Sequence, residues 1–244
     1  VVPPASQRPK APMRVVNTTL TATHAGVTGT GNIGLWFDLD CQLIELYGVT
    51  ATDHPWVGIM VEGCNNVYAT GCVVDNSDGY STGAGGAGED FILGGITVAE
   101  STNVTFDSFG VVDSVRAIVV RQSNRSADWY NSNNSSFVNY SWAAGPRYWI
   151  KATGPLPVPG VSDTSNMWSG NITFSGGLLT SCNRVLLQEG SNGGGMSAAG
   201  SLPLSTIHFV DNDYTNAPSI QFYDRSNTGL NLAAWQSLPF DRDQ

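Results

Sequence analysis

Charge is scarce in this chain, and positive charge is the scarcer kind. Only 13% of the residues are charged, with 11 Lys and Arg against 20 Asp and Glu, which gives a formal net charge of −9. Lysine occurs only at Lys10 and Lys151. Nucleic acids are bound through a basic face that neutralises their phosphates. The sequence therefore predicts no nucleic-acid partner.

Long apolar runs and closely paired cysteines are also lacking. No stretch reaches the roughly 20 apolar residues of a membrane-spanning helix, so we expect no membrane span. The four cysteines lack the paired spacing of a zinc site. Cys41 and Cys64 could form a disulfide or remain buried thiols, and the sequence leaves both open. The chain starts at Val1 without an initiator Met or a signal peptide, so we interpret it as a mature or trimmed chain.

Glycine is abundant, and a glycine-led segment recurs along the chain. The 28 Gly, together with many Val, Thr, Asn and Ser, favour strands and turns over long helices. Residues 34–38 and 58–62 lie 24 positions apart; each begins with Gly, alternates apolar with variable residues and ends on a carboxylate. This spacing fits one coil of a parallel β-helix. Similar segments occur at 95–99, 117–121, 147–151, 184–188 and 219–223.

A second segment repeats between these strands and opens with asparagine, at Asn66, Asn103, Asn134 and Asn171. Asn tolerates the left-handed backbone of a sharp corner. We therefore predict an all-β solenoid with loop insertions, and keep an antiparallel β-sandwich as the alternative. The predicted organisation is a Pro-rich extended arm over 1–14, the parallel β-helix over 15–230 and a closing segment over 231–244, with a short helix near 231–235.

Strand alternation sorts the glycine-led segment into inward and outward rows. The predicted inward residues are Leu35, Phe37, Ile59, Val61, Ile96, Val98, Ile118, Val120, Tyr148, Ile150, Val185, Leu187, Ile220 and Phe222. One outward row reads Trp36, Met60, Thr97, Val119, Trp149, Leu186 and Gln221. The other reads Asp38, Glu62, Ala99, Arg121, Lys151, Gln188 and Tyr223. We expect both outward rows to face solvent.

The second outward row contains the candidate chemistry. Asp38 and Glu62 lie on adjacent coils whose backbones are about 4.7–5 Å apart, and this separation suits a catalytic carboxylate pair. With Asp40 they could instead hold Ca²⁺, since the ligands are all oxygen, and no other cofactor is required. Arg121 and Lys151 could hold an anionic sugar. The alternative is that this row is ordinary solvated surface.

Two further features point to a sugar-rich extracellular setting. Trp36 and Trp149, on the first outward row, could stack on sugar rings. Seven Asn-x-Ser/Thr sequons favour a secreted glycoprotein, although a chain this rich in Asn, Ser and Thr forms several by chance. They begin at Asn17, Asn103, Asn124, Asn133, Asn134, Asn139 and Asn171.

The Gly34–Cys41 segment, followed by Gly58–Glu62, resembles the right-handed parallel β-helix proteins of the pectate-lyase-like superfamily. The segment Leu232–Gln236 is similar to the Leu-x-x-Trp-Gln that often follows their last coil. The resemblance implies a single-stranded right-handed parallel β-helix and a polysaccharide ligand. The superfamily includes lyases, hydrolases, epimerases and viral tailspikes, so the fold does not choose among activities. The paired Asp and Gly-His-Gly of polygalacturonases are absent.

We therefore expect an extracellular protein that binds polysaccharide and degrades it as a glycoside hydrolase or a lyase. The alternative is a non-catalytic structural or adhesive β-helix in a fibre, a viral spike or a cell-surface assembly. In both cases the first coil exposes strand edges. We expect either earlier coils missing from this chain, or a second chain or another copy that caps this end.

Overall fold

The structure is a computed structural model of the 244-residue chain. It describes residues 12–22, 33–37, 41–62, 64–77, 94–99, 101–114, 116–122, 139–141, 148–150, 170–189, 204–214, 220–224, 229–239 and 243. Among these residues, no helix has the length and apolar character needed to cross a membrane.

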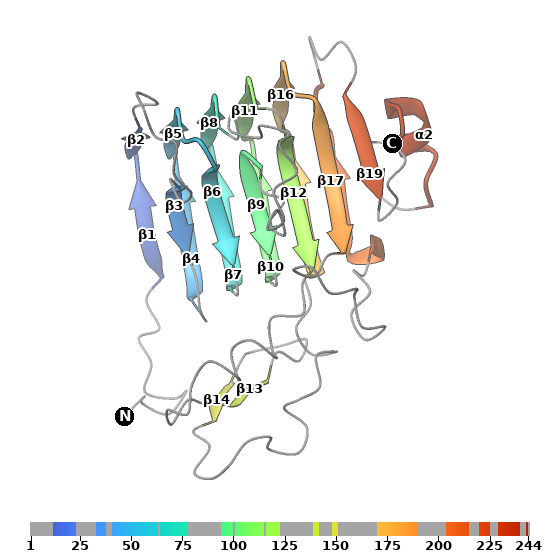
Figure 1. The fold of residues 1–244 in the computed structure, drawn as a ribbon. Coiled ribbons are helices and arrows are strands. Elements are labelled where there is room, and N and C mark those ends of the chain that lie inside the picture. Colours follow the sequence, from blue (N-terminus) through green and yellow to red (C-terminus); the bar gives the residue numbers. More distant parts are fainter. Residues whose placement is uncertain are drawn as a thin grey trace, which may run out of the picture.

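Three parallel sheets form the body of the protein (Figure 1). Sheet A contains β1 (Met13–Val16), β4 (Gln42–Tyr47), β7 (Asn65–Thr70), β10 (Thr102–Asp107), β15 (Gly170–Ser175) and β18 (Ile207–Val210). Sheet B contains β2 (Thr19–Thr21), β5 (Thr50–Thr52), β8 (Val73–Asp75), β11 (Gly110–Val112) and β16 (Leu178–Thr180). Sheet C contains β3 (Ile33–Phe37), β6 (Val57–Glu62), β9 (Ile96–Ala99), β12 (Arg116–Gln122), β17 (Arg184–Glu189) and β19 (Gln221–Asp224).

The chain visits sheets A, B and C in turn and then returns to sheet A beside its previous strand. Every strand pairing within the three sheets is parallel, which excludes the antiparallel sandwich. The protein is therefore an all-β stack of three parallel sheets, consistent with a β-helix solenoid. The strands β1, β2 and β3 lie at one edge of their sheets, and the short 3₁₀ helix η3 (Leu204–Thr206) precedes β18 at the other end.

Two positions in the predicted repeat are wrong. The segment at 147–151 is not a coil of the stack, because β12 pairs directly with β17, aligning Ile118 with Val185. Its strand β14 (Tyr148–Ile150) pairs antiparallel with β13 (Asn139–Ser141), and Figure 1 draws this pair outside the three sheets. In the last coil Val185 pairs with Phe222 and not with Ile220, so that strand is shifted by two residues. The alternating pattern is unchanged by a two-residue shift, which is why the sequence could not detect it.

The core lies inside the three sheets and contains the predicted inward residues of the coils. Ile59, Ile96, Ile118, Val61 and Val98 are fully buried in one apolar cluster. At the C-terminal end the core becomes aromatic: Phe106, Phe174 and Phe209 stack with ring centroids 5.6 and 5.2 Å apart. The predicted short helix is found as α2 (Leu232–Gln236), capped by Asn231. Its Trp235 is buried on Phe222, with centroids 4.8 Å apart.

The repeated Asn marks a left-handed corner, as predicted. Asn66, Asn103 and Asn171 have φ values of 58°, 54° and 51°. Their amides also form a ladder: Asn103 Nδ2 donates to Asn66 Oδ1 at 3.2 Å, and Asn171 Nδ2 donates to Asn103 Oδ1 at 3.1 Å. The fourth copy, Asn134, lies outside the described residues. The ladder ties three successive coils together at the entrance to sheet A.

Glycine and cysteine occupy crowded places beside the core. A Cβ atom on Gly58 would lie 2.9 Å from Cγ2 of the buried Val74 and closer still to Cγ1, so the start of the glycine-led strand has no room for a side chain. All four cysteines are free thiols, which decides against a disulfide between Cys41 and Cys64. The Cys64 Sγ–H group lies 3.1 Å from the Glu62 carbonyl oxygen and 3.4 Å from that of Phe37.

Candidate functional site

Sheet C brings together two of the predicted site residues, Trp36 and Glu62. Trp36 in β3 is paired with Met60 in β6, two residues before Glu62. The indole Nε1–H of Trp36 donates a hydrogen bond to Glu62 Oε2 at 3.1 Å. Trp36 is 50% exposed, whereas Glu62 is 2% exposed. A half-exposed indole thus lies against a buried carboxylate at the N-terminal end of the sheet.

In the middle coils of sheet C the outward residues are not open to solvent, contrary to the sequence prediction. Met60, Thr97 and Val119 continue the row of Trp36 from strand to strand, and each is at most 3% exposed. Burial of a carboxylate such as that of Glu62 is tolerated only with hydrogen bonds, and Trp36 supplies one. A polymer lying along the middle coils of sheet C therefore cannot reach these side chains in this conformation.

The remaining predicted residues are placed less completely. Arg121 shares the row of Glu62, because Ala99 pairs with Glu62 on one side and with Arg121 on the other. Trp149 lies on β14 and therefore not on the predicted row. Nothing is described of the Arg121 and Trp149 side chains, while Asp38, Asp40 and Lys151 lie wholly outside the described residues. Within the described part of the chain, no group of three His, Cys, Asp or Glu side chains could hold a metal, so the Ca²⁺ site stays a prediction.

An open polar surface lies on sheet A, whose side chains alternate between core and solvent. Two outward rows run across its six strands in register, and neither has a buried member. The first row, called row 1, is Arg14, Glu45, Tyr68, Thr105, Thr173 and His208. The second, row 2, is Val16, Tyr47, Thr70, Asp107, Ser175 and Val210. Sequence reasoning missed this face because it followed the carboxylates of the glycine-led strand. The alternation Val67-Tyr68-Ala69 beside Asn66 carried the missing signal.

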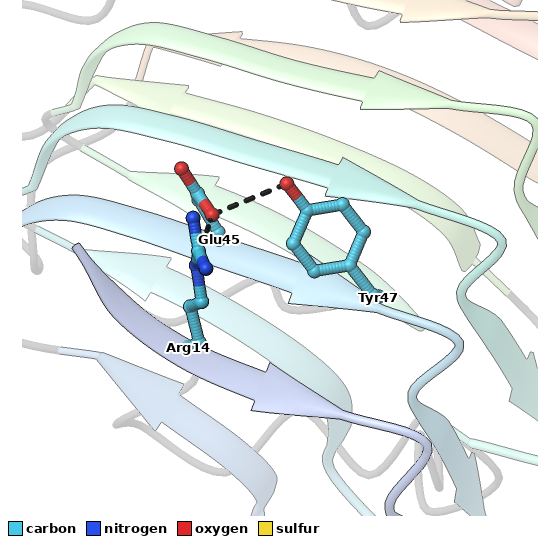
Figure 2. A network of polar contacts seen from close by, with 3 residues as sticks. All are labelled: Arg14, Glu45 and Tyr47. Atoms are coloured by element: carbon cyan, nitrogen blue, oxygen red, sulfur yellow. Dashed lines mark hydrogen bonds and ion pairs between the residues drawn. The ribbon is translucent and has the colours of Figure 1, made fainter.

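A polar network lies at the N-terminal end of this face (Figure 2). Arg14 Nε and Glu45 Oε2 form an ion pair at 2.6 Å, and the Tyr47 hydroxyl donates to the same oxygen at 3.2 Å. The hydrogen bond to Glu45 raises the pKa of the Arg14 guanidinium. Desolvation raises the pKa of the Tyr47 phenol, and its hydrogen bond to Glu45 adds to the rise. Tyr47 is therefore held as a neutral hydroxyl beside a compensated charge pair.

Tyr47 and Tyr68 form an aromatic pair on adjacent coils. Their ring centroids are 6.2 Å apart, with an angle of 62° between the ring planes. Tyr68 is 40% exposed and lies diagonally from Tyr47, one row across. Large exposed aromatic side chains with a polar tip are typical of binding surfaces, because they offer contact area and a hydrogen-bonding group at a low entropy cost.

Asp107 lies at the centre of row 2 and gathers hydroxyl groups. Its strand pairs Asp107 with Thr70 on one side and with Ser175 on the other. Ser175 Oγ donates to Asp107 Oδ1 at 3.0 Å. Ser108 Oγ and Thr70 Oγ1 donate to Asp107 Oδ2 at 3.2 and 3.5 Å. The carboxylate is thereby held in one orientation on a surface that a ligand can reach.

Comparison of the chain with protein-family models, with curated proteins and with solved structures finds no match. The likeness to the pectate-lyase-like superfamily therefore rests on the motifs and on the parallel coils alone, and the activity has to be argued from the surface.

Proposed function

We propose that the protein is an extracellular polysaccharide-binding protein with a right-handed, single-stranded parallel β-helix, and that the polysaccharide lies across the outer face of sheet A. The observation that supports this is the contrast between two faces. The outward residues of sheet A are accessible over six strands, whereas those of the middle coils of sheet C are buried. The repeating rows of hydroxyl groups match a ligand that itself repeats.

Two parts of the sheet A face have distinct roles in binding. Tyr47 and Tyr68 supply the aromatic contact at the N-terminal end. Asp107 and Ser175 are paired on adjacent coils, as are Thr105 and Thr173 in the neighbouring row, so each pair supplies hydrogen-bonding groups one coil spacing apart, which is about 4.7–4.9 Å. An extended glycan therefore meets a new polar group at each coil. Many weak contacts of this kind add up along a polymer, as in other multivalent binding.

Retention on insoluble polysaccharides tests the proposal. The panel contains cellulose, xylan, β-glucan and chitin, and the variants are Tyr68→Ala and the control Leu178→Ala. Leu178 is 44% exposed on sheet B and Tyr68 is 40% exposed on sheet A, so the two changes remove similarly exposed side chains from different faces. We expect Tyr68→Ala to weaken retention about tenfold, as is usual for a central aromatic contact. Leu178→Ala should bind like the native chain.

Two results would overturn the proposal. Equal retention of both variants would remove sheet A as the binding face. No retention of the native chain on any polymer would favour the structural or adhesive alternative, in which a second chain caps the edge strands of the first coil. Sedimentation of the native chain would then show whether it self-associates.

Cleavage of the polysaccharide is a second candidate, supported by the Trp36–Glu62 pair. A half-exposed indole bonded to a buried carboxylate is an arrangement in which a sugar could displace the indole and meet the carboxylate. Asp38 would then be the partner of Glu62 as acid and base, or with Asp40 as a Ca²⁺ ligand. Arg121, on the row of Glu62, would hold an anionic sugar, and Lys151 and Trp149 would be further sugar contacts.

Product analysis with Glu62→Gln tests this second candidate. We expect reducing ends from a hydrolase, or unsaturated products from a lyase that depends on Ca²⁺, and loss of either in the variant. Trp36→Phe is the matched control for folding, because it keeps an aromatic ring on β3 but removes the donor to Glu62. Unchanged product formation by Glu62→Gln would exclude this residue from the reaction.

A further inference from the structure

We infer that the sheet A face selects uncharged polysaccharides over polyuronates, and that Asp107 is the residue that determines this selection. The inference rests on the proposed function and adds the class of ligand. It differs from the sequence expectation for Arg121 and Lys151, which favoured an anionic sugar. It follows from the hydrogen bonds and the charges of the described part of sheet A.

The hydrogen-bonding capacity around Asp107 is biased toward acceptors. A carboxylate offers about four lone-pair sites, and Thr70, Ser108 and Ser175 fill three of them. One site of Asp107 therefore remains for a ligand. Each of the three hydroxyl groups donates its single hydrogen to Asp107, so its oxygen can only accept a hydrogen bond from a ligand. The cluster as a whole requires a ligand that donates.

Neutral and acidic sugars differ in this respect. A neutral sugar unit presents several O–H donors, whereas a uronate carboxylate is an acceptor without hydrogen to give. A uronate placed over Asp107 would leave acceptor facing acceptor, and both groups would lose their bonds to water. The donor and acceptor pattern thus favours a polyhydroxyl ligand at this position.

The charge on the face acts in the same direction. Two carboxylates, Glu45 and Asp107, lie on the described rows of the face. Arg14 compensates Glu45 through the ion pair at 2.6 Å. The Asp107 carboxylate accepts hydrogen bonds only from neutral hydroxyl groups in the described part of the chain, so no cation compensates its negative charge there. The net charge of −9 adds a general repulsion of polyanions.

Affinity electrophoresis in gels that contain a soluble polysaccharide tests the inference. Soluble neutral glucan and xylan are compared with polygalacturonate, for the native chain, Asp107→Asn, Asp213→Asn and Ser175→Ala. Asp213 is an exposed residue bridged to sheet B, so its change removes the same charge from a different face. Ser175→Ala removes one hydroxyl from the cluster without changing charge, and it serves if Asp107→Asn is poorly folded.

We expect the native chain to be retarded by a neutral polymer and not by polygalacturonate. Asp107→Asn should weaken neutral retention about tenfold, since it loses charge-assisted hydrogen bonds. It should also raise affinity for polygalacturonate by roughly threefold, because one like charge is gone near the surface. Asp213→Asn should match the native chain. Ser175→Ala should weaken neutral retention and leave polygalacturonate excluded.

The outcomes separate this inference from the proposed function. Native binding to polygalacturonate that equals binding to the neutral polymers would overturn the selection and leave polysaccharide binding intact. Equal effects of Asp107→Asn and Asp213→Asn would remove Asp107 as its determinant. No retardation by any polymer would defeat both the proposed function and the inference.

Discussion

Replacing Gly58 with Ala should destabilise the coil stack through a single steric clash. The added Cβ would lie 2.9 Å from Val74 Cγ2, closer still to Cγ1, and 3.1 Å from the Gly95 carbonyl oxygen. Val74 is fully buried, so it cannot move into solvent. Gly58 also lies where its own N–H and that of Ile59 both bond the Gly95 carbonyl at 3.0 Å, which fixes the backbone. Overpacking of this kind costs about 1–3 kcal/mol, and we expect about 2 kcal/mol.

Gly110→Ala is the matched control. A Cβ on Gly110 would have its nearest neighbour, Val73 Cγ2, at 3.7 Å, which is ordinary van der Waals contact. Such a change should leave stability unaltered or raise it by about 0.4–1 kcal/mol, because Ala narrows the unfolded ensemble. Both variants remove a strand glycine, so their difference isolates the clash.

Urea unfolding followed by tryptophan fluorescence measures both variants. The midpoint should fall for Gly58→Ala at an unchanged m-value. Val74→Ala alone should cost about 2–3 kcal/mol, from two lost methyl groups and the cavity they leave. In the double variant Gly58→Ala/Val74→Ala the new methyl occupies that space, so the cost should fall short of the sum by about 1–2 kcal/mol. Additive costs, or equal midpoints for Gly58→Ala and Gly110→Ala, would refute the reasoning.

Two further predictions concern ionisable groups beside the stack. Burial first, and then the charges of Asp113 and Asp53, raise the pKa of Asp75. Folding therefore favours the protonated form of Asp75, so the free energy of unfolding falls as pH rises through this pKa. Asp75→Asn should be more stable than the native chain at pH 7. The urea midpoints of the two proteins should converge near pH 4 or below, where Asp75 is protonated in the folded and unfolded chains alike. Burial raises the pKa of the Cys182 thiol to about 11, and desolvation also raises that of Cys72. Both thiols should resist a thiol-reactive disulfide reagent at pH 8 until urea unfolds the chain, and labelling of the folded protein would contradict this.

The repeat that is visible in the sequence depends on the preferences of single residues and single strands, and the same repeat is found in the structure. Asn66, Asn103 and Asn171 adopt the left-handed corner because that conformation is a property of single residues. The inward positions of the coils are buried because alternation is fixed within one strand. A coil could therefore be predicted without knowledge of its neighbours, except where loop insertions intervene, as at Tyr148–Ile150.

Only part of the candidate site could be predicted from the alternation of residues along single strands. The sequence placed Trp36 and Glu62 on neighbouring strands, and the hydrogen bond between them follows from that placement. It also predicted that the row beyond Trp36 would be exposed, whereas Met60 is 3% exposed. Alternation tells which side of a strand a residue occupies, but it does not tell whether that side meets water.

The sequence by itself determined the repeat of the coils, its corners and its core positions, because each depends on one residue or one strand period. The tertiary structure alone decided that the outward side chains of sheet A are open while those of the middle coils of sheet C are buried, because burial depends on everything that packs above a sheet. It also decided that Asp107 gathers hydroxyl groups from Thr70 and Ser175. Those residues are far apart in sequence, and they become neighbours only when parallel coils stack in register.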